Sequence, residues 1–131
     1  MILVDTSTLI DFLKGENNDT TDKFRNALES RMPFGITSQI FQEVLQGAGS
    51  LTEYNKLKRY LGSQRFFHPH DPIASYAHAA KIYFDCRKKG ITLRSTIDCL
   101  IAQIALEQDL ALLHNDRDFA AMAAVIPLKQ F

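Results

Sequence analysis

The stretch MILVDTSTLIDFLKG, residues 1–15, opens the chain and decides its fold class. Its first four residues, Met1–Val4, are apolar and run directly into the carboxylate of Asp5. An unbroken apolar run of this kind is typical of a strand buried on both faces, as in the middle of a parallel sheet. Apolar side chains at helical spacing follow over Thr6–Leu13, and Gly15 ends them. We therefore expect a buried strand, an acid at its end, and then a helix.

The rest of the chain repeats this alternation of short apolar segments and helical patterns. We predict further strands or extended segments at residues 34–37, 65–72, 111–115 and 126–131. We predict helices over residues 22–30, 38–48, 51–64, 73–89, 92–110 and 116–125. Strands that alternate with helices indicate an α/β protein, which we expect to be a three-layer α/β/α fold with a mostly parallel central sheet.

The composition is that of one globular domain of 131 residues, with 46% hydrophobic and 23% charged residues. Fifteen basic and 15 acidic residues give no net charge, so any attraction to nucleic acid has to come from local patches or a bound cation. Cys86 and Cys99 cannot build a disulfide framework, and we expect them to be reduced in a cytoplasmic protein. We expect no signal peptide and no contact with a membrane.

Acidic residues follow the predicted strands. Asp5 ends the first strand, Glu43 lies in the helix after the second, and Asp98 lies in the first turn of the strongest helical pattern. Asp116 and Asp118 come directly after the segment 111–115. Because ligands of parallel sheets bind outside the carboxyl ends of the strands, we expect these acids to meet in one crevice.

Ordinary structural roles also account for single acids. Asp5 and Asp118 fit helix N-caps, and Asp98 fits a capping box with Ser95. Asp116 fits a turn. As a group, however, closely packed carboxylates would raise one another's pKa unless a cation were present. Carboxylates suit Mg²⁺ or Mn²⁺, and no Cys/His pair has the spacing of zinc ligands.

Four blocks of the sequence resemble VapC-type PIN-domain ribonucleases, the toxins of type II toxin–antitoxin pairs. The blocks are VDTSTLIDFLKG, QEVLQGA, RSTIDCLIAQIA and LLHNDRDF, and they occur in the order and spacing of that family. The resemblance covers essentially the whole chain and implies a single PIN domain over residues 1–131. It also implies Mg²⁺-dependent cleavage of RNA, with Mn²⁺ as a substitute and tRNA as the leading candidate substrate.

The resemblance places a catalytic acidic tetrad at Asp5, Glu43, Asp98 and Asp116. It implies that Asp5, Asp98 and Asp116 bind the metal, while Glu43 holds a metal-bound water or completes a second metal site. The resemblance also favours a supporting role for Ser7, and whether Asp118 contacts metal or caps a helix stays open. Arg94 directly precedes the helix of Asp98, a position that suits either a phosphate contact at the positive helix end or an ordinary solvated arginine. The chain departs from the family at Ala120 and Ala121, where relatives often carry another acid.

The resemblance further implies a VapB-like antitoxin as partner and a homodimer. The segment 51–67, LTEYNKLKRYLGSQRFF, is a candidate for either contact, although we expect most of it to pack in the core. Three rival interpretations remain. A haloacid-dehalogenase-like phosphatase needs a second Asp where Ser7 stands, and a response-regulator receiver needs paired acids after its first strand. An inactive PIN-like binding module is the third.

Overall fold

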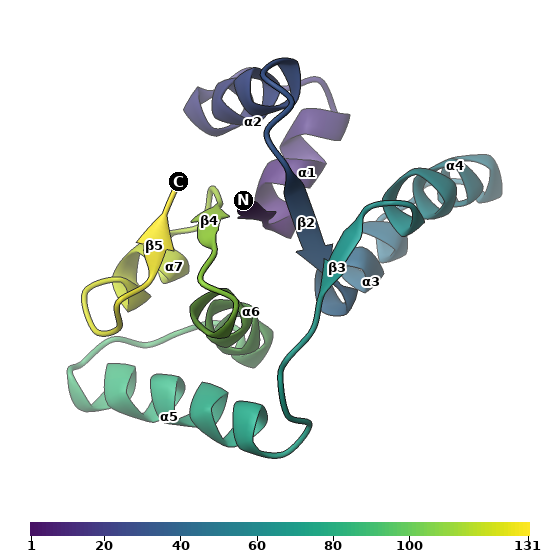
Figure 1. Cartoon of the computed structure of the whole chain (residues 1–131). Coiled ribbons are helices and arrows are strands. Elements are labelled where there is room, and N and C mark those ends of the chain that lie inside the picture. Colours follow the sequence, from purple (N-terminus) through teal and green to yellow (C-terminus); the bar gives the residue numbers. More distant parts are fainter.

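The computed structural model describes residues 1–131, and its centre is a five-stranded sheet in which all neighbouring strands are parallel (Figure 1). The strand order is β3-β2-β1-β4-β5. The strands are β1 (Ile2–Val4), β2 (Phe34–Thr37), β3 (Arg65–Phe67), β4 (Ala111–Leu113) and β5 (Lys129–Gln130). The predicted α/β class is confirmed, and the sheet is wholly rather than mostly parallel.

Seven helices cover the two faces of this sheet. They are α1 (Thr6–Leu13), α2 (Asp19–Glu29), α3 (Ser38–Gln46), α4 (Leu51–Gly62), α5 (Ala74–Lys88), α6 (Thr96–Glu107) and α7 (Arg117–Met122). Helix α1 contacts α2 and α3, α3 contacts α4, and α6 contacts both α5 and α7. Figure 1 shows α1 and α2 on one side of the sheet and α5 and α6 on the other, which is the expected three-layer arrangement.

The strand order reverses direction between β1 and β4. The chain moves outward from β1 through β2 to β3, and then returns to the other side of β1 as β4 and β5. Strands β1 and β4 pair in register, with Val4 opposite Leu113. A reversal of this kind leaves a crevice at the carboxyl ends of the two central strands, because their connections leave toward opposite faces. Asp5 follows β1 at this point, and Asp116 lies shortly after β4.

The core lies between the sheet and its helices, as the apolar first strand predicted. Leu3, Val4, Ile101 and Ile104 are almost inaccessible to solvent. Cys86 and Cys99 are buried and unpaired, as expected. No helix combines the length and the apolar character needed to cross a membrane.

Some predicted boundaries are wrong for local reasons. Helix α2 starts at Asp19 instead of residue 22, because Asn18 and Thr21 form a capping box ahead of the apolar pattern. Helix α6 starts at Thr96 and not at residue 92, which leaves Arg94 in a loop.

Candidate active site

A wholly polar pocket with a cavity volume of about 340 Å³ lies at the crevice between β1 and β4. The structure brings every predicted site residue to its wall. The lining consists of Asp5, Thr6, Ser7, Glu43, Arg94, Ser95, Asp98, Asp116 and Asp118. Thr6 and Ser95 were not in the predicted set, and the signal for both was their position directly beside a predicted residue.

Asp5 is both a helix cap and a wall of the pocket. Its carboxylate is 4% exposed and accepts hydrogen bonds from the Ser7 backbone N–H at 3.1 Å and the Ser7 Oγ at 2.8 Å. The Ser7 Oγ in turn accepts from the backbone N–H of Asn115, at 2.9 Å, beyond the end of β4. This chain of bonds ties the two central strand ends together. Burial raises the pKa of Asp5 above its usual range, against the lowering effect of the Ser7 bonds.

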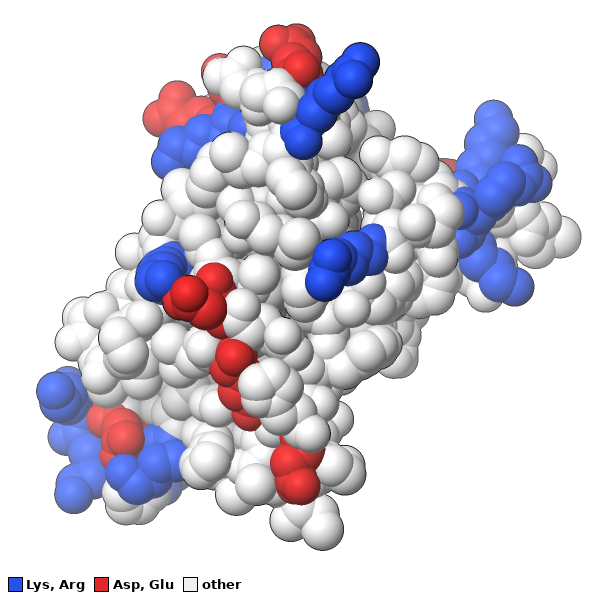
Figure 2. Space-filling model, viewed as in Figure 1, with Lys and Arg blue, Asp and Glu red and all other residues white.

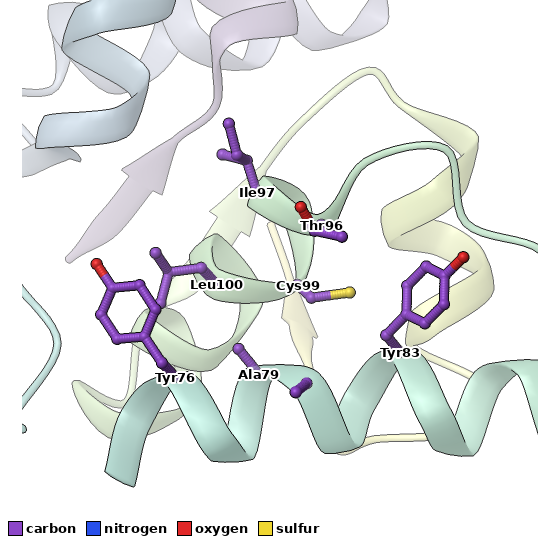
Figure 3. Close-up of a pocket in the computed structure, with 8 residues that line it drawn as sticks. Tyr76, Ala79, Tyr83, Thr96, Ile97, Cys99 and Leu100 are labelled. Atoms are coloured by element: carbon purple, nitrogen blue, oxygen red, sulfur yellow. The ribbon is translucent and has the colours of Figure 1, made fainter. Parts of the chain in front are cut away.

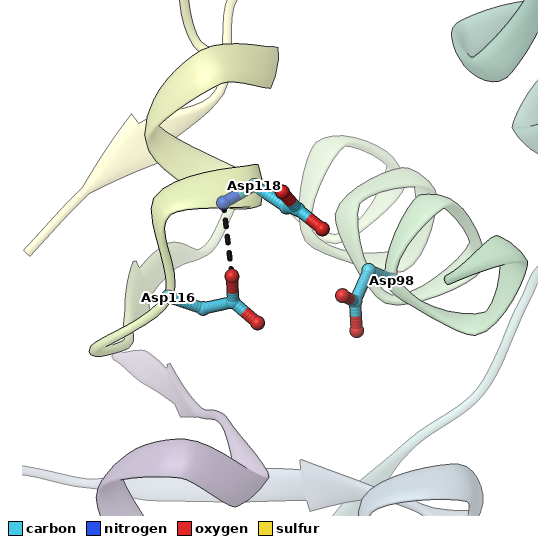
Figure 4. Close-up of side chains that lie close together, drawn as sticks. All are labelled: Asp98, Asp116 and Asp118. Carbon is cyan, nitrogen blue, oxygen red and sulfur yellow. Dashed lines mark hydrogen bonds between the residues drawn. The ribbon is translucent and has the colours of Figure 1, made fainter. Parts of the chain in front are cut away.

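Three other carboxylates of the pocket lie close together (Figure 4). Asp98, Asp116 and Asp118 each offer an oxygen, and these oxygens all lie within 4.8 Å of one another. Asp116 is the N-cap of α7 and accepts the Asp118 backbone N–H at 2.9 Å. Capping of this helix therefore falls to Asp116 and not to Asp118. The alternative of a capping box is also wrong, since Ser95 makes no side-chain cap hydrogen bond at the start of α6.

Arg94 compensates the negative charge of Asp116 and Asp118. Its Nη2 donates to Asp116 Oδ1 at 2.9 Å, and its Nε donates to Asp118 Oδ2 at 3.1 Å. The Arg94 backbone N–H also reaches Asp118 Oδ2, at 3.0 Å. Asp118 is only 5% exposed, so this shared cation and backbone donor make its burial tolerable. Hydrogen bonding and attraction to Asp118, followed by the charge of Asp116, raise the pKa of Arg94 further.

The remaining acids have no such partner. None of the ion pairs in the structure involves Asp5, Glu43 or Asp98. Burial, and then the charges of the neighbouring acids, raise the pKa of Asp98 to about 7. Burial and the charge of Asp5 raise the pKa of Glu43, although Glu43 accepts a hydrogen bond from Thr6 Oγ1 at 3.3 Å. The uncompensated negative charge of the pocket therefore lies on Asp5, Glu43 and Asp98.

These residues fit a hard divalent cation. The charged donors are carboxylates alone, without the thiolate or imidazole that zinc prefers. Two oxygens bound to one Mg²⁺ lie at most about 4.2 Å apart, which is twice the usual Mg–O distance. The 4.8 Å limit for Asp98, Asp116 and Asp118 is close to that value, so rotation of these side chains would suffice. The compact group contains Asp118 but not Asp5, which lines the same pocket.

Comparison with known proteins agrees with this geometry. The family model of the PIN domain matches residues 2–125. This chain belongs to the PIN-domain family. It is 30% identical over 130 residues to the VapC ribonuclease Mb1587 of Mycobacterium bovis and, equally, to ribonuclease VapC11 of Mycobacterium tuberculosis. Each alignment covers 98% of this chain and 96% of the relative, so the similarity to VapC ribonucleases extends over nearly all of both proteins.

Solved structures share the fold of this PIN domain at lower sequence identity. VapBC-1 from nontypeable Haemophilus influenzae matches with a TM-score of 0.74 and 20% identity, over 100% of this chain and 97% of the other. VapBC2 from Rickettsia felis, solved with a DNA fragment from the promoter, matches with a TM-score of 0.72 and 17% identity, over 100% and 98%. A toxin–antitoxin complex from Klebsiella pneumoniae matches with a TM-score of 0.69 and 22% identity, over 98% and 99%.

The PIN domain has a second, apolar pocket on the other side of the first turn of α6 (Figure 3). Asp98 belongs to the acidic pocket, while Ile97, Cys99 and Leu100 line a groove of about 320 Å³ against α5. Tyr76 and Tyr83 of α5 stand at its two ends. The sequence alone does not indicate this groove. Apolar residues on two neighbouring helices are the usual pattern of a closed contact in the core.

Proposed function

We propose that this protein is a metal-dependent endoribonuclease that hydrolyses RNA phosphodiester bonds as the toxin of a type II toxin–antitoxin pair. The observation that carries the proposal is the meeting of five carboxylates around one pocket with a single arginine among them. The two mycobacterial relatives are named ribonucleases, which supports the same activity here. We also propose that residues 1–131 form one PIN domain that acts in the cytoplasm.

We assign the cation to Asp5, Asp98 and Asp116, and add Asp118 because its carboxylate belongs to the compact group. A bound Mg²⁺ or Mn²⁺ would supply positive charge to the scissile phosphate and make a coordinated water acidic. Carboxylate ligation alone favours these ions, and Mg²⁺ is the abundant choice.

The other residues of the pocket act on water and phosphate. Glu43 has a raised pKa and lines the pocket outside the compact group of Asp98, Asp116 and Asp118, which suits it to orient the attacking water and accept its proton. Arg94 is 57% exposed and holds its guanidinium at the rim, where it can contact a phosphate oxygen. Ser7 positions Asp5 through two hydrogen bonds and fixes its orientation.

We further propose a VapB-like antitoxin as partner, a homodimeric assembly and a structured RNA, with tRNA first, as substrate. Several structural neighbours carry toxin–antitoxin names, including VapBC-1 and the complex from Klebsiella pneumoniae, which supports an antitoxin partner. The homodimer and the tRNA substrate rest on the resemblance to VapC-type toxins.

Incubation of purified protein with total RNA tests the activity. We expect discrete fragments with Mg²⁺ and none with EDTA or with the Asp5→Asn variant, because EDTA removes the cation and the substitution removes one of its charged ligands. Mapping the fragment ends would then identify the RNA and the cleaved bond. Absence of cleavage by folded, Mg²⁺-saturated protein on any cellular RNA would overturn the proposal in favour of an inactive binding module.

A further inference from the structure

We infer that the exposed face of α4 is a docking surface for unpaired segments of RNA, such as the loops of a structured RNA, and that it holds the substrate while the acidic pocket cleaves it. The inference rests on the proposed ribonuclease activity. The pocket itself cannot supply the affinity, because five carboxylates and one arginine line it and repel a polyanion. A chain with no net charge therefore needs a separate cationic surface for RNA.

Helix α4 is exposed to an extent that core packing does not explain. Nine of the ten residues from Leu51 to Tyr60 are exposed, and only Leu57 is half-buried. The expectation that most of the segment 51–67 packs in the core is wrong for this helix. Figure 1 shows α4 projecting from the edge of the molecule, beyond β3 and beside α3. Helix α3 contacts α4 and carries Glu43, so α4 is attached to one wall of the pocket.

The positive charge of α4 is not neutralised within the chain. Residues 51–65 contain Lys56, Lys58, Arg59 and Arg65 and a single acid, Glu53, whose carboxylate accepts the Gly49 backbone N–H at 3.1 Å. No ion pair or side-chain hydrogen bond in the structure uses the three cations of α4. In Figure 2 they form the blue group at the projecting end of the molecule. Unpaired cations along one helix are available to consecutive phosphates.

Two exposed tyrosines lie among these cations. Tyr54 is 37% exposed and Tyr60 is 45% exposed. Tyr54 is four residues from Lys58, and Tyr60 is four residues from Lys56, so each ring neighbours an ammonium group on the helix surface. Rings for base stacking beside cations for phosphates are the combination that binds single-stranded nucleic acid, which favours RNA over an acidic peptide.

A second basic cluster, at the end of α5, provides a matched control. It contains Arg87, Lys88 and Lys89, the same number of cations as α4. Two of them already face aromatic rings, with Arg87 5.8 Å from the ring centre of Tyr83 and Lys88 5.6 Å from that of Phe84. Equal removal of charge at the two clusters separates a local docking surface from an effect of net charge.

The test compares the two triple variants by fluorescence anisotropy on a single-stranded RNA of mixed sequence, in EDTA to prevent cleavage. We expect Lys56→Gln/Lys58→Gln/Arg59→Gln to weaken binding at least tenfold, and to lower the slope of log K against log salt by about 2, from about 0.7 per lost phosphate contact. We expect Arg87→Gln/Lys88→Gln/Lys89→Gln to stay within about twofold of wild type. Equal losses in the two variants, or no loss in the α4 variant, would overturn the inference.

The double variant Tyr54→Ala/Tyr60→Ala tests whether the α4 surface binds RNA or an acidic peptide, and it leaves the charge of the protein unchanged. We expect roughly fivefold weaker RNA binding for each lost ring, an unchanged salt slope, and unchanged binding of a polyglutamate peptide. A loss for polyglutamate as large as the loss for RNA would make an acidic peptide the occupant and overturn the assignment.

Cleavage assays with Mg²⁺ distinguish this inference from the proposed function. We expect the α4 triple variant to raise KM for long RNA while kcat is maintained. If wild type cleaves and the triple variant has the same KM, only the docking surface fails. If wild type binds RNA through α4 without cleaving it, only the ribonuclease activity fails.

Discussion

The acids of the pocket fall into two groups that differ in how their negative charge is compensated. In the first group, Asp116 and Asp118 share the guanidinium of Arg94, and Asp118 also accepts a backbone N–H. In the second group, Asp5, Glu43 and Asp98 have no cationic partner, and burial together with the charges of neighbouring acids raises the pKa of each. Arg94 compensates the negative charge of the first group within the chain. The charge of the second group is compensated only by an added cation.

This difference indicates where a metal ion has its largest effect. A cation near Asp98 would relieve repulsion from several carboxylates at once, and Arg94 would compete with it for Asp116 Oδ1. The fold tolerates these acids without a metal because their raised pKa values favour the neutral carboxyl form. The site therefore gives up some stability in its metal-free form in favour of cation binding.

The largest expected effect on activity comes from a substitution among the acids that have no cationic partner. Asp98→Asn keeps the size of the side chain but removes a charged ligand, so we expect RNA cleavage to fall by more than about 100-fold, beyond the usual cost of losing an outer-shell partner. Initial rates on total RNA with saturating Mg²⁺ measure this. Asp22→Asn, which removes an exposed acid paired with Arg25, is the control and should be fully active. Substantial activity in Asp98→Asn would contradict the assignment of Asp98 to the cation.

Glu43→Gln should have a smaller effect, because Glu43 acts on water and is not among the proposed direct ligands. The amide oxygen can still accept from Thr6 Oγ1, so the local structure should persist. We expect a loss of about 10- to 100-fold in kcat, the range for partners outside the ligand shell, with little change in KM. Gln42→Ala, on the exposed side of α3, serves as the control. A loss as large as that of Asp98→Asn would instead make Glu43 a direct ligand.

The stability of the metal-free protein should depend on pH through Asp98. Its pKa of about 7 in the folded state lies above the ordinary value of 3.8, so the folded state holds this proton more tightly than the unfolded state. The stabilisation from the protonated form is present below about pH 4 and is lost as pH rises toward 7. After allowance for solvent screening, we expect a loss of about 2 kcal/mol in the free energy of unfolding.

Urea unfolding of wild type and Asp98→Asn in EDTA, between pH 5 and 8, measures this contribution. The difference between the two proteins should grow with pH, with Asn the more stable at pH 8, because the neutral amide avoids the repulsion. Saturating Mg²⁺ should remove most of the pH dependence in wild type. Parallel stability curves for the two proteins in EDTA would show that Asp98 does not titrate in this range.

Removal of Arg94 should produce the smallest effect. It should leave both groups of acids without a cationic partner. Arg94→Gln frees Asp116 Oδ1 and Asp118 Oδ2 from the guanidinium. We expect Mg²⁺ to bind more tightly, by up to about tenfold, the low end for changes beside a metal site, while KM for RNA rises. Isothermal titration calorimetry measures the affinity, with Arg25→Gln as the exposed control. Weaker Mg²⁺ binding would mean that Arg94 supports the ligand geometry instead of competing with the ion.

Much of the fold and of the site was predictable because it depends on local pattern. The apolar run before Asp5 indicated a central strand, and that strand is the middle one of the sheet. The position of each acid after a strand or early in a helix predicted their meeting in one crevice, since parallel strands end at a common edge. Boundaries such as the start of α6 were less certain, because a helical pattern of apolar residues does not locate the first hydrogen-bonded turn.

The sequence by itself determined the α/β alternation, the acids at the strand ends and the absence of net charge, because periodicity and composition are properties of the linear chain. The tertiary structure alone decided that Arg94 neutralises Asp116 and Asp118 but leaves Asp98 uncompensated. It also decided that α4 projects with its cations unpaired. Burial, ion pairing and pKa depend on distances between residues far apart in the chain, and only the packing of the elements against one another sets those distances.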